Sequence, residues 1–230
     1  MGLITNMKTE TERYARQYNL ISQEILNSCK VITLGCGIGG SWATYLLAKM
    51  GIRDIEVYDF DKVEDANIPS QLYGVHDIGK YKVDALTEKI ARDVGIIICN
   101  HVEKVTKDTE FDITGNTIIL LAVDTIEARK EIFSKLKGSM AYMIDGRIGG
   151  EIGYQIYGVN LSNEEECNKF ERTLEGTFVN DMPCGTKAII YSSLDLVSQI
   201  VNITKRVLVK EKHPTYINKS VVNFDQLVRY

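Results

Sequence analysis

The sequence predicts an α/β fold, built on a mainly parallel sheet that antiparallel strands continue and that an added N-terminal helix precedes. Apolar runs of strand length alternate with helical patterns between residues 30 and 145, as in chains that form parallel sheets. A glycine-rich turn follows the first of these strands, and an acidic residue follows the second. Beyond residue 150 apolar and polar side chains alternate, which indicates half-buried antiparallel strands.

The composition is that of an ordinary globular protein. The 230 residues are 44% hydrophobic and 25% charged and include three prolines, which fits one domain with a substantial core. The net charge of −4 gives no reason to expect binding to DNA or to an anionic membrane. The five cysteines include no C-x-x-C pair, and no signal-peptide pattern is present, so a reducing cytoplasmic location is expected.

A helix is predicted for residues 9–28, ahead of the first strand. Its amphipathic pattern carries Arg13, Arg16 and Gln17. A helix in this place is an addition to the alternating pattern, and its two arginines are available to reach an anion. The alternative is that both arginines are solvated on a surface helix.

A strand, a glycine-rich turn, a helix and a second strand follow over residues 30–61. Gly35 permits a tight turn, Gly37 lets backbone N–H groups approach a phosphate, and Gly40 lets the helix pack closely on the strand. The helix N-terminus then faces the phosphates. Asp59, about twenty residues beyond the glycines, is placed to accept hydrogen bonds from ribose hydroxyls. A Rossmann-like nucleotide-binding unit is therefore predicted; the alternative is a glycine-rich turn that binds nothing.

The next segment reads as a loop followed by a helix. The helix is predicted to start near Asp77, as its cap, and to end near Val94. Lys80 and Lys82 then fall in its first turn, where they oppose the helix dipole. Such local conflicts tend to occur at functional sites.

Strands are also predicted for residues 95–100, 116–123 and 141–145, with a helix over 125–137. Ligands of open α/β sheets lie outside the carboxyl ends of the strands, so Asp59, Asp124 and Asp145 are expected at one rim. Three carboxylates beside a polyphosphate call for a cation, and Mg²⁺ suits carboxylate, water and phosphate oxygens. Any of the three could instead cap a helix, and for Asp145 a structural role of that kind is favoured.

The C-terminal part is predicted to contain an antiparallel strand over residues 151–157, a long helix over 188–209 and a closing strand over 221–227. Residues 160–182 are polar and acidic, show no firm element and are expected to form a mobile loop. Polar side chains recur near helical spacing along the long helix and argue against a membrane span; they are Asp195, Gln199, Asn202 and Lys205.

An ordered series of motifs runs from Arg13 to Arg129. It consists of Arg13-Tyr-x-Arg16-Gln17, Gly35-x-Gly37-x-x-Gly40, Asp59-Phe-Asp61-x-Val63-Glu64-x-x-Asn67-x-x-x-Gln71, Asp77-Ile-Gly79-Lys80-x-Lys82-Val83, and Asp124 with Arg129 five residues later. The series is far more specific than any of its motifs alone. The chain resembles the ThiF, MoeB and HesA family of ubiquitin-activating-enzyme-like adenylyltransferases, densely up to Arg129 and more thinly afterwards.

The resemblance implies an activity that uses ATP and Mg²⁺. These would adenylate the C-terminal carboxylate of a ubiquitin-like or sulfur-carrier protein and release pyrophosphate. By position, Asp59 would hold the ribose, Lys82 the phosphates and Asp124 the Mg²⁺. The remaining nucleotide-binding positions would be Asp61, Asn67 and Gln71.

The resemblance also implies an assembly. Arg16 would reach into the site of a partner subunit, so a homodimer is expected. Residues 1–230 would form one adenylation domain, with a helical arm (1–28), a nucleotide-binding half (29–150) and a half for acceptor and dimer contacts (151–230). Because a carboxylate attacking a phosphate brings two anions together, cations and N–H donors must neutralise charge, and no general base is needed.

Three departures from the family pattern stand out. The arginine that usually precedes Gln71 is Ser70 here, and neighbouring Lys80 is a candidate replacement. The two C-x-x-C pairs that bind zinc in many members are absent, so no zinc is predicted. The Asp-Asn of the metal position is Asp124-Thr125.

Cys184 precedes the long C-terminal helix, where several family members carry a cysteine that attacks the acyl-adenylate. A helix N-terminus raises the thiolate fraction that a nucleophile requires. The alternative is a small packing residue. Cys36 is interpreted as filler of the glycine turn, Cys29 and Cys99 as core, and Cys167 as part of the acidic loop.

Other functions are left open by the sequence. The acceptor could be a small acid, a peptide or the carboxylate of a modified tRNA nucleoside, although the acidic composition disfavours tRNA. A nicotinamide-dependent oxidoreductase would use the same glycine pattern but leaves Arg16, Lys82 and Asp124 unexplained. A non-catalytic scaffold is the fourth hypothesis, kept open by Ser70.

Overall fold

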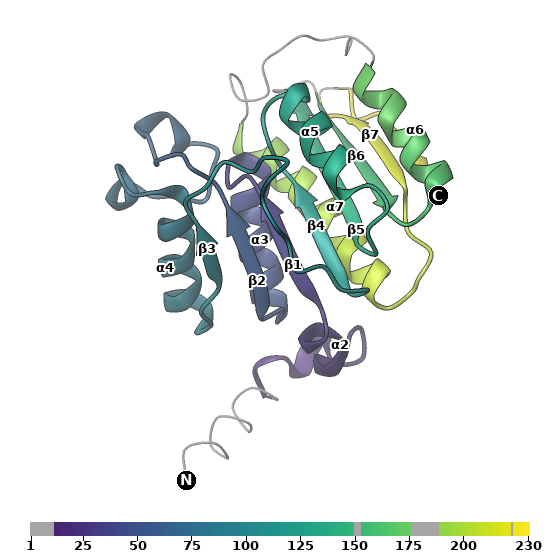
Figure 1. Cartoon of the computed structure of the whole chain (residues 1–230). Coiled ribbons are helices and arrows are strands. Elements are labelled where there is room, and N and C mark those ends of the chain that lie inside the picture. The colour runs from purple at the N-terminus through teal and green to yellow at the C-terminus, as the bar shows by residue number, and fades with distance from the viewer. Residues whose placement is uncertain (1–11, 150–152, 176–188, 222) are drawn as a thin grey trace.

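The fold is organised around one mixed sheet (Figure 1). The computed structural model describes residues 12–149, 153–175, 189–221 and 223–230, and within them the sheet has eight strands in the order β3-β2-β1-β4-β5-β6-β7-β8. The strands are β1 (Lys30–Leu34), β2 (Asp54–Tyr58), β3 (Cys99–His101), β4 (Thr117–Leu121), β5 (Tyr142–Gly149), β6 (Gly153–Asn160), β7 (Tyr216–Ser220) and β8 (Gln226–Arg229). Strands β1 to β5 pair in parallel, and β6 to β8 are antiparallel to their neighbours. The predicted change from parallel to antiparallel pairing is confirmed.

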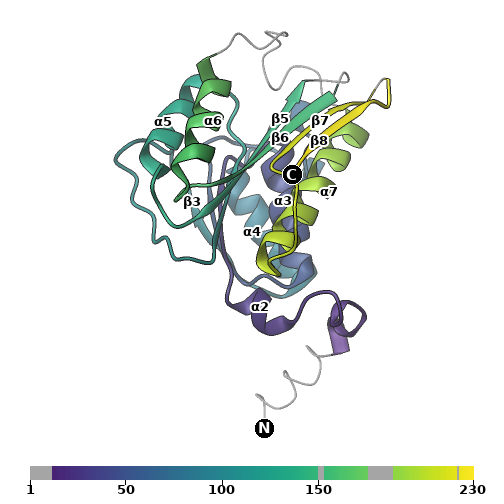
Figure 2. The same cartoon turned by 90° about the vertical axis from the view of Figure 1, so that its right-hand side faces the viewer.

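Helices cover both faces of the sheet (Figure 2). One face is covered by α3 (Ile38–Met50), α4 (Lys82–Val94) and α7 (Ile190–Leu208), and the other by α5 (Ile126–Leu136) and α6 (Glu164–Glu175). Successive side chains of β1 enter different cores, Val31 on the α3 side and Ile32 on the α5 side. This explains why β1 and β4 are mainly apolar and are buried at every position.

The prediction of one continuous N-terminal helix is wrong for the residues that the structure describes. Residues 12–28 form the short 3₁₀ helix η1 (Ala15–Gln17) and α2 (Gln23–Asn27) rather than one helix. Ser22 has extended backbone angles, and its hydroxyl accepts a hydrogen bond from the N–H of Ile25. Ser22 therefore starts a new helix, as a side chain that caps an N-terminus does.

The predictions between residues 75 and 101 are also corrected. Asp77 ends the short helix η3 (Val75–Asp77), and its carboxylate accepts from the N–H of Gly74 at 3.0 Å, so it does not cap α4. Helix α4 starts only at Lys82, because Tyr81 is extended. Strand β3 pairs over three residues, and the preceding Ile96 and Ile98 enter the core without pairing.

The acidic stretch is helical where the structure describes it, which contradicts the predicted loop over residues 160–182. The side chain of Asn163 accepts from the N–H groups of Glu165 and Glu166 and caps α6. Cys167, Phe170 and Leu174 lie on one buried face at spacings of three and four residues. The sequence therefore held a helix signal that the run of glutamates obscured.

The C-terminal prediction is partly confirmed. Helix α7 spans Ile190–Leu208, close to the predicted range of residues 188–209. The single closing strand is instead the hairpin of β7 and β8, in which Tyr216 pairs with Arg229. Among the helices that the structure describes, none combines the length and apolar character that crossing a bilayer requires.

Candidate functional site

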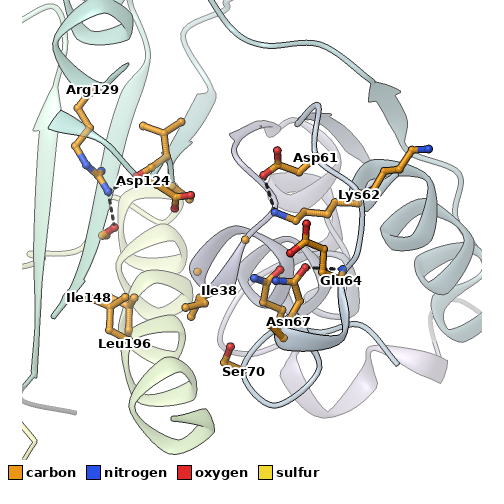
Figure 3. Close-up of a pocket in the computed structure, with 18 residues that line it drawn as sticks. Ile38, Asp61, Lys62, Glu64, Asn67, Ser70, Asp124, Arg129, Ile148 and Leu196 are labelled. Carbon is orange, nitrogen blue, oxygen red and sulfur yellow. Dashed lines mark hydrogen bonds and ion pairs between the residues drawn. The ribbon is translucent and has the colours of Figure 1, made fainter. Parts of the chain in front are cut away.

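A cavity of about 380 Å³ lies where the glycine turn, the segment after β2 and the ends of β4 and β5 meet (Figure 3). Helix α7 closes its far side with Leu196. The residues that line it are Gly37, Ile38, Gly39, Asp61, Lys62, Glu64, Ala66, Asn67, Ser70, Gln71, Lys82, Ala122, Val123, Asp124, Arg129, Gly146, Ile148 and Leu196. The cavity therefore lies at the carboxyl ends of the parallel strands, the rim at which open α/β sheets bind ligands.

The glycines of the turn have separate physical roles. Gly35 has φ +95°, and a Cβ there would lie 2.5 Å from the carbonyl oxygen of Ala122. A Cβ on Gly40 would lie 1.9 Å from the carbonyl oxygen of Gly35. Gly37 is the N-cap of α3, and a Cβ on it would have no neighbour within 4 Å. Packing thus requires Gly35 and Gly40, whereas Gly37 presents bare backbone at a helix N-terminus that lines the cavity.

Asp59 lies behind the glycine turn rather than among the lining residues. Its two carboxylate oxygens accept hydrogen bonds from the N–H groups of Cys36, at 2.6 Å, and Asp61, at 2.8 Å. Burial raises the pKa of Asp59 above its ordinary value, against the positive charge of Lys82 and these two hydrogen bonds. In this structure Asp59 therefore fixes the glycine turn.

Lys82 and Asp61 form an ion pair at the cavity wall, with their nitrogen and oxygen 2.9 Å apart. Burial would lower the pKa of Lys82, but the hydrogen bond that Lys82 donates to Asp61 and the charges of Asp59, Asp61 and Asp124 together raise it. Lys82 is therefore a firmly protonated cation. Its unfavourable place in the first turn of α4 is offset by these carboxylates.

Asp124 lies on the opposite wall of the cavity from Asp61 (Figure 3). The cap of α5 is the next residue, Thr125, whose hydroxyl accepts from the N–H of Ala128. Asp124 therefore does not cap α5. Burial in the cavity wall raises the pKa of Asp124, and the positive charge of Lys82 partly opposes this rise. The structure brings Lys82, Asp124 and the glycine turn into one cavity.

The segment after β2 contributes amides to the wall. Asn67 accepts from the N–H of Glu64 at 2.9 Å through its side-chain oxygen. The side-chain oxygen of Gln71 is buried and has no hydrogen-bond partner among the described residues. A buried acceptor without a partner lowers stability unless a ligand supplies a donor or a cation.

Lys80, the predicted replacement for the missing arginine, is not among the lining residues. Its ammonium group lies 2.6 Å from Glu88 and 3.4 Å from Asp77. Lys62 lines the cavity instead, with its ammonium group 5.0 Å from the centre of the Tyr81 ring. Ser70 also lines the cavity, so the position of the usual arginine does face the site.

Asp145 is structural, as favoured, but it is not a helix cap. Its carboxylate is fully buried and pairs with Arg129 and with Arg147, the latter at 2.6 Å. Arg129 also donates to the carbonyl oxygen of Val123 and so braces the end of β4 beside Asp124. Sequence reasoning missed Arg147, although its spacing of two residues from Asp145 on one strand places both on the same face.

Arg16 lies at the other end of the molecule from the cavity. Arg13 donates to the carbonyl oxygen of Val94 at 2.7 Å, and Gln17 donates to that of Met50. These carbonyls end α4 and α3, whose first turns border the cavity. Each helix has 13 residues and is therefore about 20 Å long, so Arg16 is remote from the cavity of its own chain.

The cysteines divide by burial. Cys184 falls in 176–188, outside the described residues. Cys36, Cys29 and Cys167 are buried, whereas Cys99 is exposed on the edge strand β3, contrary to its predicted place in the core. Within residues 12–149, 153–175, 189–221 and 223–230, no three His, Cys, Asp or Glu side chains are grouped to hold a metal ion by themselves.

Comparison with known protein families shows the family of this chain. The model of the ThiF family matches residues 13–228 of the 230-residue chain. The chain belongs to the ThiF family. Both the predicted nucleotide-binding unit (residues 30–61) and the antiparallel strands β6 and β7 lie within this match, although the motifs thin out after Arg129.

The chain is also similar to two curated relatives and to one solved structure. The NEDD8-activating enzyme E1 catalytic subunit of Arabidopsis thaliana is 32% identical over 128 residues, covering 54% of this chain and 28% of the relative. The molybdopterin-synthase adenylyltransferase of Salmonella typhimurium is 26% identical over 162 residues, covering 66% of this chain and 65% of the relative. The crystal structure of PaaA superposes with a TM-score of 0.74 and 22% identity, covering 96% of this chain and 82% of PaaA.

The match covers only part of each curated relative. The chain spans about a quarter of one curated relative and just under two thirds of the other. The likeness to PaaA shows the shared fold.

Proposed function

We propose that the protein is an ATP-dependent adenylyltransferase that activates the C-terminal carboxylate of a ubiquitin-like or sulfur-carrier protein. One observation carries the proposal: Lys82, Asp124 and the bare backbone at Gly37 line a single cavity in a chain of the ThiF family. The molybdopterin-synthase adenylyltransferase and the NEDD8-activating subunit supply the substrate class by analogy.

The cavity fits a nucleotide with its metal ion. Gly37 offers unobstructed N–H groups at the N-terminus of α3, and Lys82 offers a firmly protonated cation. The side-chain oxygen of Gln71, which has no partner in the described part of the chain, is an acceptor for a ligand or its metal. The carboxylates of Asp61 and Asp124 are hard ligands suited to Mg²⁺, which needs further oxygens from phosphate and water because the described side chains form no complete metal site. Mg²⁺ would supply charge neutralisation on the phosphates.

The reaction then requires positioning and charge stabilisation. An oxygen of the acceptor carboxylate attacks the α-phosphorus of ATP, the new O–P bond forms, and the bond to pyrophosphate breaks. The carboxylate is already ionised, so no side chain has to remove a proton. Lys82 exchanges its contact with Asp61 for a phosphate oxygen, and the N–H groups at Gly37 donate to the same polyphosphate.

The remote place of Arg16 supports a homodimer. Because Arg13 and Gln17 tie the arm to the far ends of α4 and α3, Arg16 can serve a cavity only if that cavity belongs to a second subunit. In this proposal residues 1–28 form the arm, residues 29–150 hold the nucleotide and residues 151–230 receive the acceptor and the partner subunit. In a second step the thiolate of Cys184 attacks the acyl-adenylate, so that a thioester forms and AMP leaves. The free thiols of the described cysteines fit a reducing cytoplasm.

The exchange of labelled pyrophosphate into ATP tests the proposal directly. We expect exchange that depends on a carrier protein with a di-glycine tail and on Mg²⁺. Exchange supported only by a short peptide, a small acid or a modified nucleoside would show that the acceptor is of that class and not a carrier protein. No exchange with any acceptor, together with tight NAD binding, would reject the adenylyltransferase. Cys184→Ala should leave the exchange intact and block only the covalent adduct.

A further inference from the structure

Residues 70–73 are fastened to the glycine turn and the first turn of α3 by three hydrogen bonds. The indole N–H of Trp42 donates to the carbonyl oxygen of Ser70 at 3.2 Å. The N–H of Leu72 donates to the hydroxyl of Ser41 at 3.3 Å. The hydroxyl of Tyr73 donates to the carbonyl oxygen of Cys36 at 2.7 Å. This segment therefore packs on the glycine turn from the side of α3.

Both polar backbone groups of Cys36 are held by buried side chains. Its N–H donates to Asp59 at 2.6 Å, and its carbonyl accepts from Tyr73. Cys36 is fully buried and Tyr73 is 3% exposed, so water does not compete for these bonds. Tyr73 itself is not among the residues that line the cavity.

The geometry of the peptide bond turns this contact into a statement about Gly37. The carbonyl of Cys36 and the N–H of Gly37 belong to one planar trans peptide group, so they point in opposite directions. Fixing the carbonyl toward Tyr73 fixes the N–H of Gly37 away from it. Gly37 lines the cavity, and its N–H has no acceptor among the described residues.

We propose that Tyr73 is a positioning residue whose hydroxyl holds the Cys36–Gly37 peptide group so that the Gly37 N–H faces the polyphosphate of the bound nucleotide. The inference rests on the proposed function, because it requires ATP in the cavity. It goes beyond the family motifs, none of which includes Tyr73.

The chemistry of the two groups supports a lasting hydrogen bond. Burial, with the negative charge of Asp59 nearby, raises the pKa of Tyr73 well above its ordinary value, so the phenol stays a donor at neutral pH. Without the hydroxyl, the Cys36 carbonyl is buried without a partner, which favours rotation of the peptide group. Rotation would turn a carbonyl oxygen toward the phosphates in place of an N–H.

Tyr73→Phe tests the proposal, because it removes the hydroxyl and keeps the ring. Binding of ATP and of adenosine to the full-length protein is measured by calorimetry in the presence of Mg²⁺. We expect ATP to bind roughly tenfold more weakly, as loss of one hydrogen bond to a charged group implies, and adenosine to bind as to the wild type. Loss of both ligands in equal measure would point to a structural role and overturn the proposal.

Two further variants complete the experiment. Tyr142→Phe is the matched control, since its hydroxyl has no hydrogen-bond partner among the described residues and lies away from the cavity; its ATP affinity should be unchanged. Ser41→Ala loosens residues 70–73 without altering Tyr73, and we expect a smaller selective loss of ATP affinity. This variant decides the matter if Tyr73→Phe does not fold.

The outcomes separate this inference from the proposed function. A wild-type protein that binds ATP while Tyr73→Phe and Ser41→Ala bind it equally well rejects the role of Tyr73 and leaves the adenylyltransferase standing. A wild-type protein that does not bind ATP rejects both.

Discussion

At the scale of single residues, the cavity combines more carboxylates than a polyphosphate site would tolerate without cations. Asp61, Glu64 and Asp124 line it, and Asp59 lies just behind. The negative charges of the three aspartates all raise the pKa of Lys82 and keep it protonated. The pairing of Lys82 with Asp61 could not be read from the sequence, because the two are 21 positions apart and meet only when the segment after β2 folds back.

Lys82→Ala should lower the rate of ATP–pyrophosphate exchange by at least about 100-fold, because it removes a preorganised cation from the site of charge development. Lys80→Ala is the matched control, since Lys80 pairs with Glu88 and Asp77 and does not line the cavity. It should keep nearly the wild-type rate. Equal losses in the two variants would contradict the assignment of Lys82.

Asp124→Asn should change the pH dependence of stability. Folding raises the pKa of Asp124. The stability linked to its protonated form is therefore fully present at pH values below the pKa of an unfolded aspartate, and it is lost as pH rises through the pKa of Asp124 in the folded state. We therefore expect the variant, which has no charge to bury, to melt at a higher temperature than the wild type at pH 8. The difference should shrink as pH falls toward the ordinary pKa of an aspartate.

Thermal melts of both proteins without nucleotide, from pH 4 to pH 8, check this prediction. The same substitution should abolish pyrophosphate exchange, so stability and activity should move in opposite directions. A variant that is less stable than the wild type at pH 8 would show that Asp124 has a favourable structural partner.

At the scale of elements, α6 shows how a helix can be hidden in its own sequence. Three glutamates at its start suggested an exposed loop, yet acidic residues in a first turn favour the helix dipole and Asn163 supplies the cap. Phe170 packs against Phe133 at 4.8 Å and Tyr157 at 5.8 Å between ring centres. The element is therefore held to the sheet by its buried face.

Phe170→Ala should destabilise the protein by about 3–5 kcal/mol, because it removes a buried aromatic ring between α6 and the sheet. Urea unfolding followed by circular dichroism measures the change. Lys169→Ala is the control on the exposed face, where loss of its solvent-exposed ion pair with Glu165 should leave the stability nearly unchanged. If α6 were not docked as described, the two variants would lose similar small amounts.

At the scale of the whole molecule, the described part of the arm (residues 12–28) and the cavity occupy opposite ends of the sheet. The arm is tied to the C-terminal ends of α3 and α4, and the cavity opens at their N-terminal ends. A single chain therefore cannot bring Arg16 to its own Lys82. This separation is the structural reason for expecting a homodimer with shared sites.

Mixing of inactive subunits tests the shared site. Arg16→Ala and Lys82→Ala should each be inactive alone, yet a mixed dimer holds one site with both side chains intact. Random re-assembly in equal amounts makes about half of the dimers mixed, each with one of two sites active, so about a quarter of the wild-type exchange rate should return. No recovery after verified subunit exchange would argue that Arg16 acts elsewhere.

The order of strands and α-helices from β1 to β5 and the glycine turn were determined by the sequence, because they depend on local periodicity and on glycines that packing demands at Gly35 and Gly40. Because parallel strands end at one edge of the sheet, the glycine turn and Asp124 were expected at one rim, and the structure places both in the lining of the cavity, together with Lys82.

Only the tertiary structure decided which polar groups pair. Asp145 with Arg129, Lys82 with Asp61 and Tyr73 with Cys36 are contacts between residues 16 to 37 positions apart. Their partners depend on how loops fold over the sheet, and a local pattern carries no record of that. The same holds for the arm, where Ser22 ends the continuity of a helix that periodicity predicted and hydrogen bonds to distant helix ends set the place of Arg16.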